Sequence, residues 1–132
     1  MGNILTMKLP QVVYYKMKST DSIITMPLEE FKKLDNLNCY YLDCASLELT
    51  RLPDLPLCAI LFCEDNLLER LPKLPFCKKL ICNSNKLVAL PSLPKCKHLE
   101  CVYNRIEVLP KLPQCKKMIC YGNSFNSKGK LD

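Results

Sequence analysis

A nineteen-residue repeat is the feature that most constrains the fold of this chain. Residues 77–95 read CKKLICNSNKLVALPSLPK, and residues 96–114 read CKHLECVYNRIEVLPKLPQ. Five units begin at residues 39, 58, 77, 96 and 115 and together span residues 39–125. A unit this short cannot bury an apolar face alone, so consecutive units must stack and share one core. The repeat therefore predicts a solenoid.

The consensus of the unit, C-x-x-L-x-C-x-x-N-x-L-x-x-L-P-x-L-P-x, predicts one short strand in each coil. In an extended segment Leu80 and Cys82 point to one side and Ile81 to the other. The L-P-x-L-P ending excludes a regular helix, because proline lacks an N–H and restricts the residue before it to extended geometry. We therefore expect a parallel sheet on one face and extended or polyproline-like return segments on the other.

An asparagine column follows the strand and is expected to bond to backbone groups at a bend. Its members are Asn66, Asn85, Asn104 and Asn123, with Leu47 at the same position of the first unit.

All ten cysteines fall in two columns of the repeat, Cys39, Cys58, Cys77, Cys96 and Cys115, then Cys44, Cys63, Cys82, Cys101 and Cys120. We interpret them as free thiols in the core, because buried cysteine behaves as a small apolar residue. Disulfides are less favoured, since the two cysteines of one unit lie too far apart along an extended segment. Zinc is also less favoured, because its sites use more closely spaced converging pairs. Free thiols predict a reducing, intracellular compartment, and we expect no cofactor.

These columns resemble the leucine-rich-repeat pattern L-x-x-L-x-L-x-x-N-x-L, with cysteine at the first and third leucine positions of each unit. The L-P-x-L-P ending is similar to short repeats of bacterial effectors. The cysteine-containing form is similar to repeat proteins of giant DNA viruses of the Marseillevirus type. The nineteen-residue period is shorter than the usual 20–29. The resemblance implies a mostly β solenoid of the α/β class and a protein-binding role, in host cytoplasm or a virion if the chain is viral.

Residues 1–38 and 126–132 do not follow the repeat. Two short strands around a polar turn at residues 19–22, then a helix in PLEEFKKLDN, predict an N-terminal α/β cap on the first coil. Leu28, Phe31 and Leu34 would share one face of that helix. Residues 126–132 are a short polar tail, so the edge of the last strand is a candidate homodimer contact.

The strand and bend positions that point away from the core are the candidate partner-binding residues. They mix large apolar groups with charges, a combination typical of protein contacts, although single surface hydrophobes are ordinary. The candidates are Tyr41, Ile60, Phe62, Lys79, Ile81, His98, Glu100, Val102, Tyr103, Lys117, Ile119 and Tyr121.

The net charge of +6 comes partly from a lysine row at Lys78, Lys79, Lys97, Lys116 and Lys117, with Lys73, Lys95 and Lys111 on the return side. Three interpretations stay open: a solvated surface, an acidic protein partner, and nucleic acid. Nucleic acid is the least favoured, because arginine is scarce and no nucleic-acid motif is present.

Catalysis is not expected, since the chain has one histidine, three glycines and no catalytic motif. No apolar run is long enough to cross a membrane. MGNILT matches the N-myristoylation pattern, which makes Gly2 a candidate for lipidation, and one such chain gives only marginal membrane binding. The leading hypothesis is a protein-binding module. The alternatives are a structural component of a viral or other assembly and a lipid-anchored adaptor.

Overall fold

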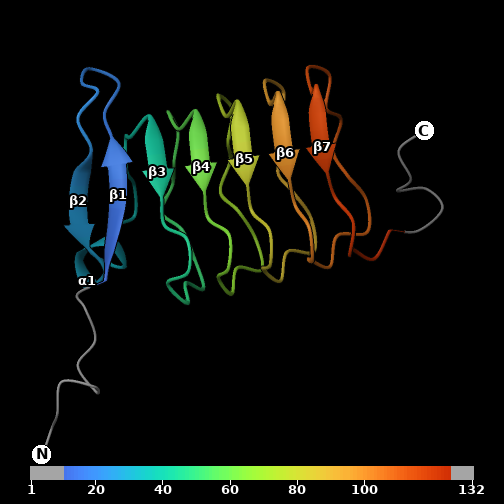
Figure 1. The fold of residues 1–132 in the computed structure, drawn as a ribbon, viewed down its shortest axis with the longest axis horizontal. Helices are drawn as coiled ribbons and strands as arrows, with labels where there is room; N and C mark the ends of the chain where they lie inside the picture. The colour runs from blue at the N-terminus through green and yellow to red at the C-terminus, as the bar shows by residue number, and fades with distance from the viewer. Residues whose placement is uncertain (1–10, 126–132) are drawn as a thin grey trace, which may run out of the picture.

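The computed structural model describes residues 11–125, which form a mostly β solenoid (Figure 1). Five short parallel strands stack side by side along the solenoid axis: β3 (Tyr41–Asp43), β4 (Ile60–Phe62), β5 (Lys79–Ile81), β6 (His98–Glu100) and β7 (Lys117–Ile119). The candidate acylation residue Gly2 and the tail 126–132 lie outside the described residues.

Strand pairing follows the sequence repeat residue for residue. Leu42 pairs with Leu61, Leu61 with Leu80, and Leu80 with Leu99, each nineteen residues further along the chain. Every coil therefore places the same repeat position on the same edge or face of the solenoid. The prediction of a solenoid with a parallel sheet on one face is confirmed.

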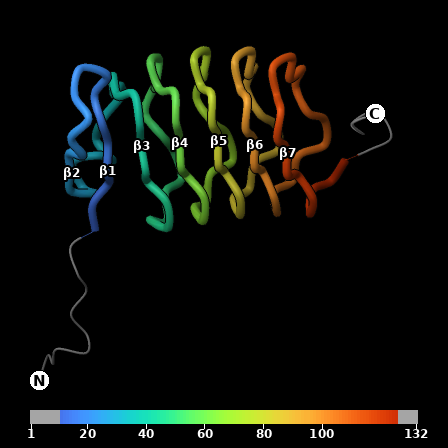
Figure 2. The backbone as a smooth tube through the Cα atoms, turned by 45° about the horizontal axis from the view of Figure 1, so that its top comes forward, coloured from blue at the N-terminus to red at the C-terminus, as the bar shows by residue number. Residues whose placement is uncertain are grey.

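The segment before the repeats contains β1 (Val12–Lys16), β2 (Ile24–Pro27) and α1 (Leu28–Phe31). Strand β1 lies between β2 and β3 and is antiparallel to both, so the sheet order is β2-β1-β3-β4-β5-β6-β7. Figure 2 shows this segment at one end of the stack of coils. Val13, Leu28 and Phe31 are buried against the same apolar core as the first coil.

The helix in this segment is shorter than the sequence predicted. It is a single turn of four residues, with Lys32 as its C-terminal capping residue. The chain beyond it is held by the first coil instead, because Leu37 N–H donates to Asp54 O and Asp54 N–H donates to Asp35 O, both at 2.9 Å. Lys33 and Leu34 still donate to Glu30 O and Phe31 O in tight turns, and the bonds to the return segment begin only at Asp35 and Leu37.

Leucine and cysteine columns fill the interior of the coils. Leu42, Leu61, Leu80 and Leu99 are fully buried, as are eight of the ten cysteines. Cys115 and Cys120 are partly exposed in the last described coil, and all ten thiols are free.

Thiols of the first cysteine column make a repeated hydrogen bond. The Sγ atoms of Cys58, Cys77, Cys96 and Cys115 each lie 3.3 Å from the carbonyl oxygen two residues ahead. Cysteine at this position is therefore both small enough for a narrow coil and able to donate to a strand carbonyl.

Asparagine side chains join each coil to the one before it. Asn85 Nδ2 donates to Cys63 O in the preceding coil at 3.0 Å and to Cys82 O in its own coil at 3.2 Å. Asn85 Oδ1 accepts from the N–H of Leu68 at 3.0 Å. Asn66, Asn104 and Asn123 repeat this arrangement. Buried backbone groups at the bend are satisfied in this way, as the asparagine column predicted.

The exception at Leu47 has a structural reason. An asparagine bonds the carbonyl 22 residues earlier, in the preceding parallel coil. The first coil follows the antiparallel strand β1 instead, so within the described residues no parallel repeat coil precedes it to which an asparagine at residue 47 could bridge. An asparagine at residue 47 would lack this partner in a preceding coil, whereas the apolar leucine needs no hydrogen bond.

Candidate protein-binding face

The outer face of the sheet, defined as the side of β3–β7 and the following bend that points away from the core, carries the candidate residues. Successive strands place them in rows: Tyr41, Ile60, Lys79, His98 and Lys117 in one row, and Asp43, Phe62, Ile81, Glu100 and Ile119 in the next. The backbone ladder therefore fixes the spacing of these side chains before any partner binds.

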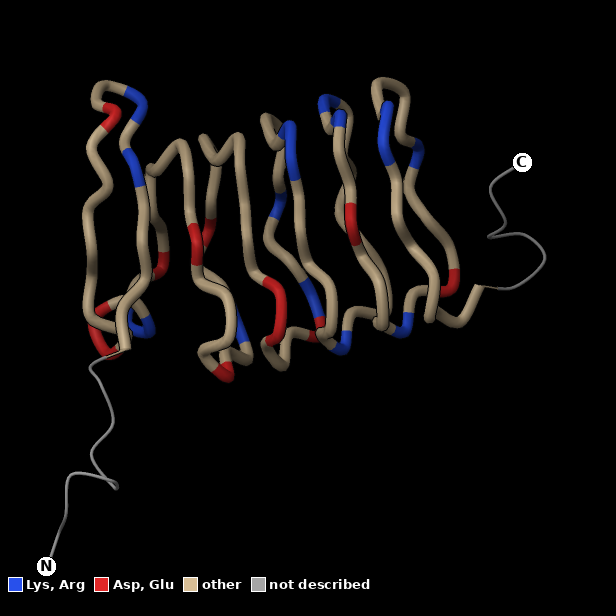
Figure 3. Tube along the Cα trace, viewed as in Figure 1, with Lys and Arg blue, Asp and Glu red and all other residues tan. Residues whose placement is uncertain are grey.

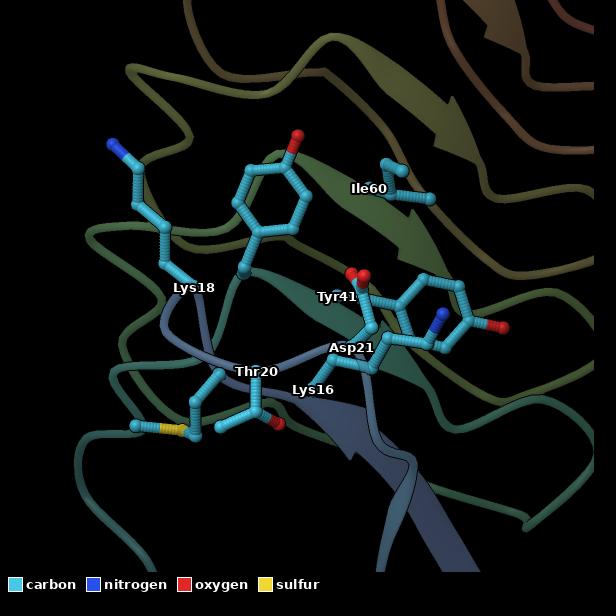
Figure 4. Close-up of a pocket in the computed structure, with 8 residues that line it drawn as sticks. Lys16, Lys18, Thr20, Asp21, Tyr41 and Ile60 are labelled. Atoms are coloured by element: carbon cyan, nitrogen blue, oxygen red, sulfur yellow. The ribbon is translucent and has the colours of Figure 1, made fainter.

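Aromatic and basic side chains interlock at the β3–β4 end of the outer face. The rings of Tyr41 and Phe62 lie 5.8 Å apart between centroids, and Lys79 Nζ lies 5.4 Å from the centre of the Phe62 ring. Lys16 Nζ lies 5.3 Å from the centre of the Tyr41 ring. Figure 4 shows Lys16 alongside Tyr41, with Ile60 on the next strand. Lysine over an aromatic ring is a favourable electrostatic contact that leaves both groups near the surface.

Lys16 was not among the sequence candidates. It reaches the outer face because β1 pairs antiparallel with β3, which places Lys16 opposite Tyr41. The lysine lies outside the repeat, so no repeat position pointed to this pairing.

A polar network occupies the β5–β6 part of the outer face. His98 Nε2 lies 2.8 Å from Glu100 Oε2, and Asn83 Nδ2 donates to Glu100 Oε1 at 3.3 Å. Asn83 Oδ1 in turn accepts from the Val102 N–H at 2.7 Å. The hydrogen bond with His98, aided by Asn83, lowers the pKa of Glu100, so this carboxylate is ionised at neutral pH.

Burial, together with the neighbouring acidic residues, raises the pKa of Glu64. Its partial burial disfavours the charged form most, and the nearby charges of Asp43, Asp65 and Glu100 act in the same direction. One carboxylate oxygen of Glu64 is buried and has no hydrogen-bond partner among the described residues. Glu64 is therefore the charge on this face that is least well accommodated by its own surroundings.

An exposed tyrosine pair marks the β7 end of the outer face. Tyr103 and Tyr121 are 61% and 62% exposed, and their rings meet edge to face at 5.5 Å between centroids. Tyr103 adopts the left-handed conformation, with φ 56°, and its ring covers Gly122, where an added Cβ would overlap the ring. The same bend position has a positive φ in every coil, at Ser46, Asp65, Ser84 and Gly122, so this conformation belongs to the repeat and is not particular to Tyr103.

Two candidate residues present little surface, contrary to expectation. Ile81 and Val102 are each only 6% exposed. Ile81 is flanked in register by Phe62 on one side and Glu100 on the other, and these longer side chains cover it. The remaining candidates are half-buried or exposed, so the accessible apolar groups are Tyr41, Ile60, Phe62, Tyr103, Ile119 and Tyr121.

Burial makes several of the thiols poorly suited to nucleophilic chemistry, whereas a hydrogen bond with Cys58 lowers the pKa of Cys39. Burial raises the pKa of Cys77 and of Cys101 to about 12, and it raises the pKa of Cys63 and Cys82 well above the ordinary value. Within residues 11–125, no group of three or more histidine, cysteine, aspartate or glutamate side chains is arranged to hold a metal ion. No helix in the same residues is long and apolar enough to cross a membrane.

Comparison with protein-family models and with curated protein sequences found no match.

Proposed function

We propose that the chain is a non-catalytic, leucine-rich-repeat-type module that binds a protein through the outer face of its sheet. The observation that carries this proposal is the band of half-exposed aromatic and aliphatic groups on consecutive strands, bordered by Lys79, His98, Glu100 and Lys117. Such a band is typical of protein contacts, and tyrosine suits them because its ring is apolar and its hydroxyl polar.

The rigidity of the outer face supports the same role. Its side chains are held by a backbone ladder and by asparagine bridges between coils. A preorganised surface loses little conformational freedom on binding, which favours affinity. In this proposal residues 1–38 act as the cap of the solenoid and residues 39–125 as the binding repeats. The partner is an intracellular protein, and a host protein if the chain is viral.

A structural role in an assembly is the second candidate. The end strands β2 and β7 each pair with only one neighbour within the described residues, so their outer edges can accept another strand. In that case contacts would form along the solenoid axis, end to end, rather than on the outer face. The lipid-anchored adaptor depends on Gly2 and stays a prediction.

Affinity capture with paired variants tests the proposed face. The double variant Phe62→Ser with Tyr121→Ser removes apolar area from the two ends of the outer face. The control Val88→Ser with Val108→Ser changes two side chains that are 56% and 51% exposed and lie outside that face. We expect the first variant to lose captured proteins that the wild type and the control both retain. Equal capture by all three would refute the proposal.

A further inference from the structure

The edge of the solenoid where β3–β7 begin carries a row of lysines, which we call the basic rim: Lys18, Lys78, Lys95, Lys97 and Lys116. Figure 3 shows basic segments along this edge over β5, β6 and β7, and further basic and acidic segments along the opposite edge of the solenoid. Lys97 N–H donates to Lys78 O at 2.8 Å, and Lys116 N–H donates to Lys97 O at 2.9 Å. These three lysines therefore follow one another at the spacing of neighbouring strands, about 4.8 Å.

No rim lysine forms an ion pair with another residue of the part of the chain that the structure describes. The ion pairs of residues 11–125 join Lys32 to Glu29, Arg51 to Asp35 and His98 to Glu100, and none of them involves the rim. Like charges on neighbouring strands repel one another and destabilise the pairing. A row of exposed lysines in register is thus a surface whose repulsion an acidic ligand would relieve.

An apolar cavity of about 370 Å³ opens at the β4 end of the rim. Leu57 and Phe76, nineteen residues apart, form its apolar walls and are 50% and 48% exposed. Lys95 Nζ lies 5.3 Å from the centre of the Phe76 ring. The cavity is lined by Lys18, Tyr40, Leu57, Ala59, Phe76, Lys78 and Lys95, and Figure 4 shows Lys18 beside the adjoining hollow.

A single small residue creates this cavity. Ala59 occupies the second position of its unit, where the other four units have Tyr40, Lys78, Lys97 and Lys116. The long side chains stand out from the rim, whereas Ala59 is 3% exposed and forms part of the floor. The rim therefore has an apolar recess at one end and a row of positive charges running from it toward β7.

We propose that the cavity and the basic rim bind an acidic protein segment in which one large apolar side chain lies to one side of a run of carboxylates. The apolar side chain enters the recess above Ala59. The carboxylates then face Lys78, Lys97 and Lys116 along the solenoid axis. This site is separate from the outer face and does not depend on the function proposed for that face.

Other anionic ligands fit these observations less well. The rim contains lysine but no arginine, because the three arginines of the chain follow the asparagine column at the opposite edge. Arginine is the residue that pairs bidentately with phosphate, so its absence from the rim disfavours nucleic acid. A membrane surface presents no single side chain to fill a recess, and membrane anchors protrude rather than form a hollow.

Selection of peptides from a displayed library of random twelve-residue sequences tests the proposal directly, with the full chain as bait. The enriched peptides are expected to combine one large apolar residue with several acidic residues on one side of it. Their affinities are then measured by fluorescence anisotropy on the wild type and on three variants.

The decisive variant is Ala59→Lys, which fills the recess with the residue that three other units carry at this position. It adds positive charge, so purely electrostatic binding would tighten, whereas loss of the recess should weaken binding about tenfold or more. Lys97→Ser with Lys116→Ser should also weaken binding, most strongly at low salt. The control Lys73→Ser with Lys111→Ser on the return side should leave it unchanged.

Several outcomes would overturn the proposal. Enriched peptides without the apolar–acidic pattern would do so, as would equal or tighter binding to Ala59→Lys. Tighter binding of a single-stranded RNA oligonucleotide, or of phosphatidylserine vesicles, with the same sensitivity to the rim variants would assign the rim to those ligands instead. The Phe62→Ser with Tyr121→Ser variant should bind the peptides normally, which separates this site from the outer face.

Discussion

Replacing Asn85 with alanine should destabilise the solenoid by several kcal/mol. Asn85 is 9% exposed, and its side chain makes hydrogen bonds to Leu68 N–H, Cys63 O and Cys82 O. Without it the buried Leu68 N–H has no acceptor, which costs about 1–3 kcal/mol. Cys63 O and Cys82 O each keep one asparagine donor, from Asn66 and Asn104, so each of those lost bonds costs about 1 kcal/mol.

The sum is about 3–5 kcal/mol, a large share of the roughly 5–15 kcal/mol by which a domain is stable. Urea unfolding followed by circular dichroism measures it, with Lys86→Ala as an exposed neighbouring control that should stay within about 0.5 kcal/mol of wild type. Asn123→Ala should cost less, because its bonds in the last coil are partly exposed. A loss below about 1 kcal/mol for Asn85→Ala, or an equal loss at Asn123, would refute the reasoning.

Three further predictions concern the thiols and the two ends of the solenoid. The pKa of Cys77 and of Cys101 is about 12 in the folded protein and 9.0 for an exposed thiol. As the pH rises, the thiols of the unfolded chain therefore lose their protons first. The free energy of unfolding should fall between pH 9 and 12, by about 1.4 kcal/mol per thiol and pH unit. Unfolding at pH 8 and pH 10 checks this, and equal stability would contradict it. Residues 39–132 alone should aggregate on expression, because Val13, Leu28 and Phe31 no longer cover the first coil; a soluble, cooperatively folded fragment would disprove the cap. The β7 edge should allow self-association at high concentration, whereas light scattering that stays at 15.2 kDa throughout would show that this edge is closed.

The repeat made the interior predictable from sequence. A column that recurs every nineteen residues must occupy equivalent places in stacked coils, so the leucines, the cysteines and the asparagine bridges followed from spacing alone. The spacing of the repeat does not indicate how large the neighbouring side chains on the adjacent strands are, and so it does not predict how exposed an outward-facing residue is. For this reason the burial of Ile81 between Phe62 and Glu100 was missed.

Features outside the repeat were also harder to predict. The polar turn and the two strands of the first segment were recognisable from local composition, but the insertion of β1 between β2 and β3 depends on a contact far along the chain. The pairing of residues 35–37 with Asp54 of the first return segment is likewise a contact that local composition does not contain. Tyrosine itself gives no indication of the left-handed φ at Tyr103. The indication lies in the column, because Ser46, Asp65, Ser84 and Gly122 occupy the same bend position with positive φ.

In-register stacking also limits how the two proposed binding surfaces can be arranged. Each repeat position recurs along one edge or face of the solenoid. Substitutions at that position in different coils therefore alter only that edge or face, and the opposite edge stays unchanged. The second position therefore determines the rim, where Ala59 opens a recess and Lys97 and Lys116 add charge. The third and fifth positions determine the outer face, where Phe62 and Glu100 lie. Since the core columns are nearly the same in every coil, with exceptions such as Leu47 and Met118, substitutions at these outer positions can change what the solenoid binds at little cost to its stability.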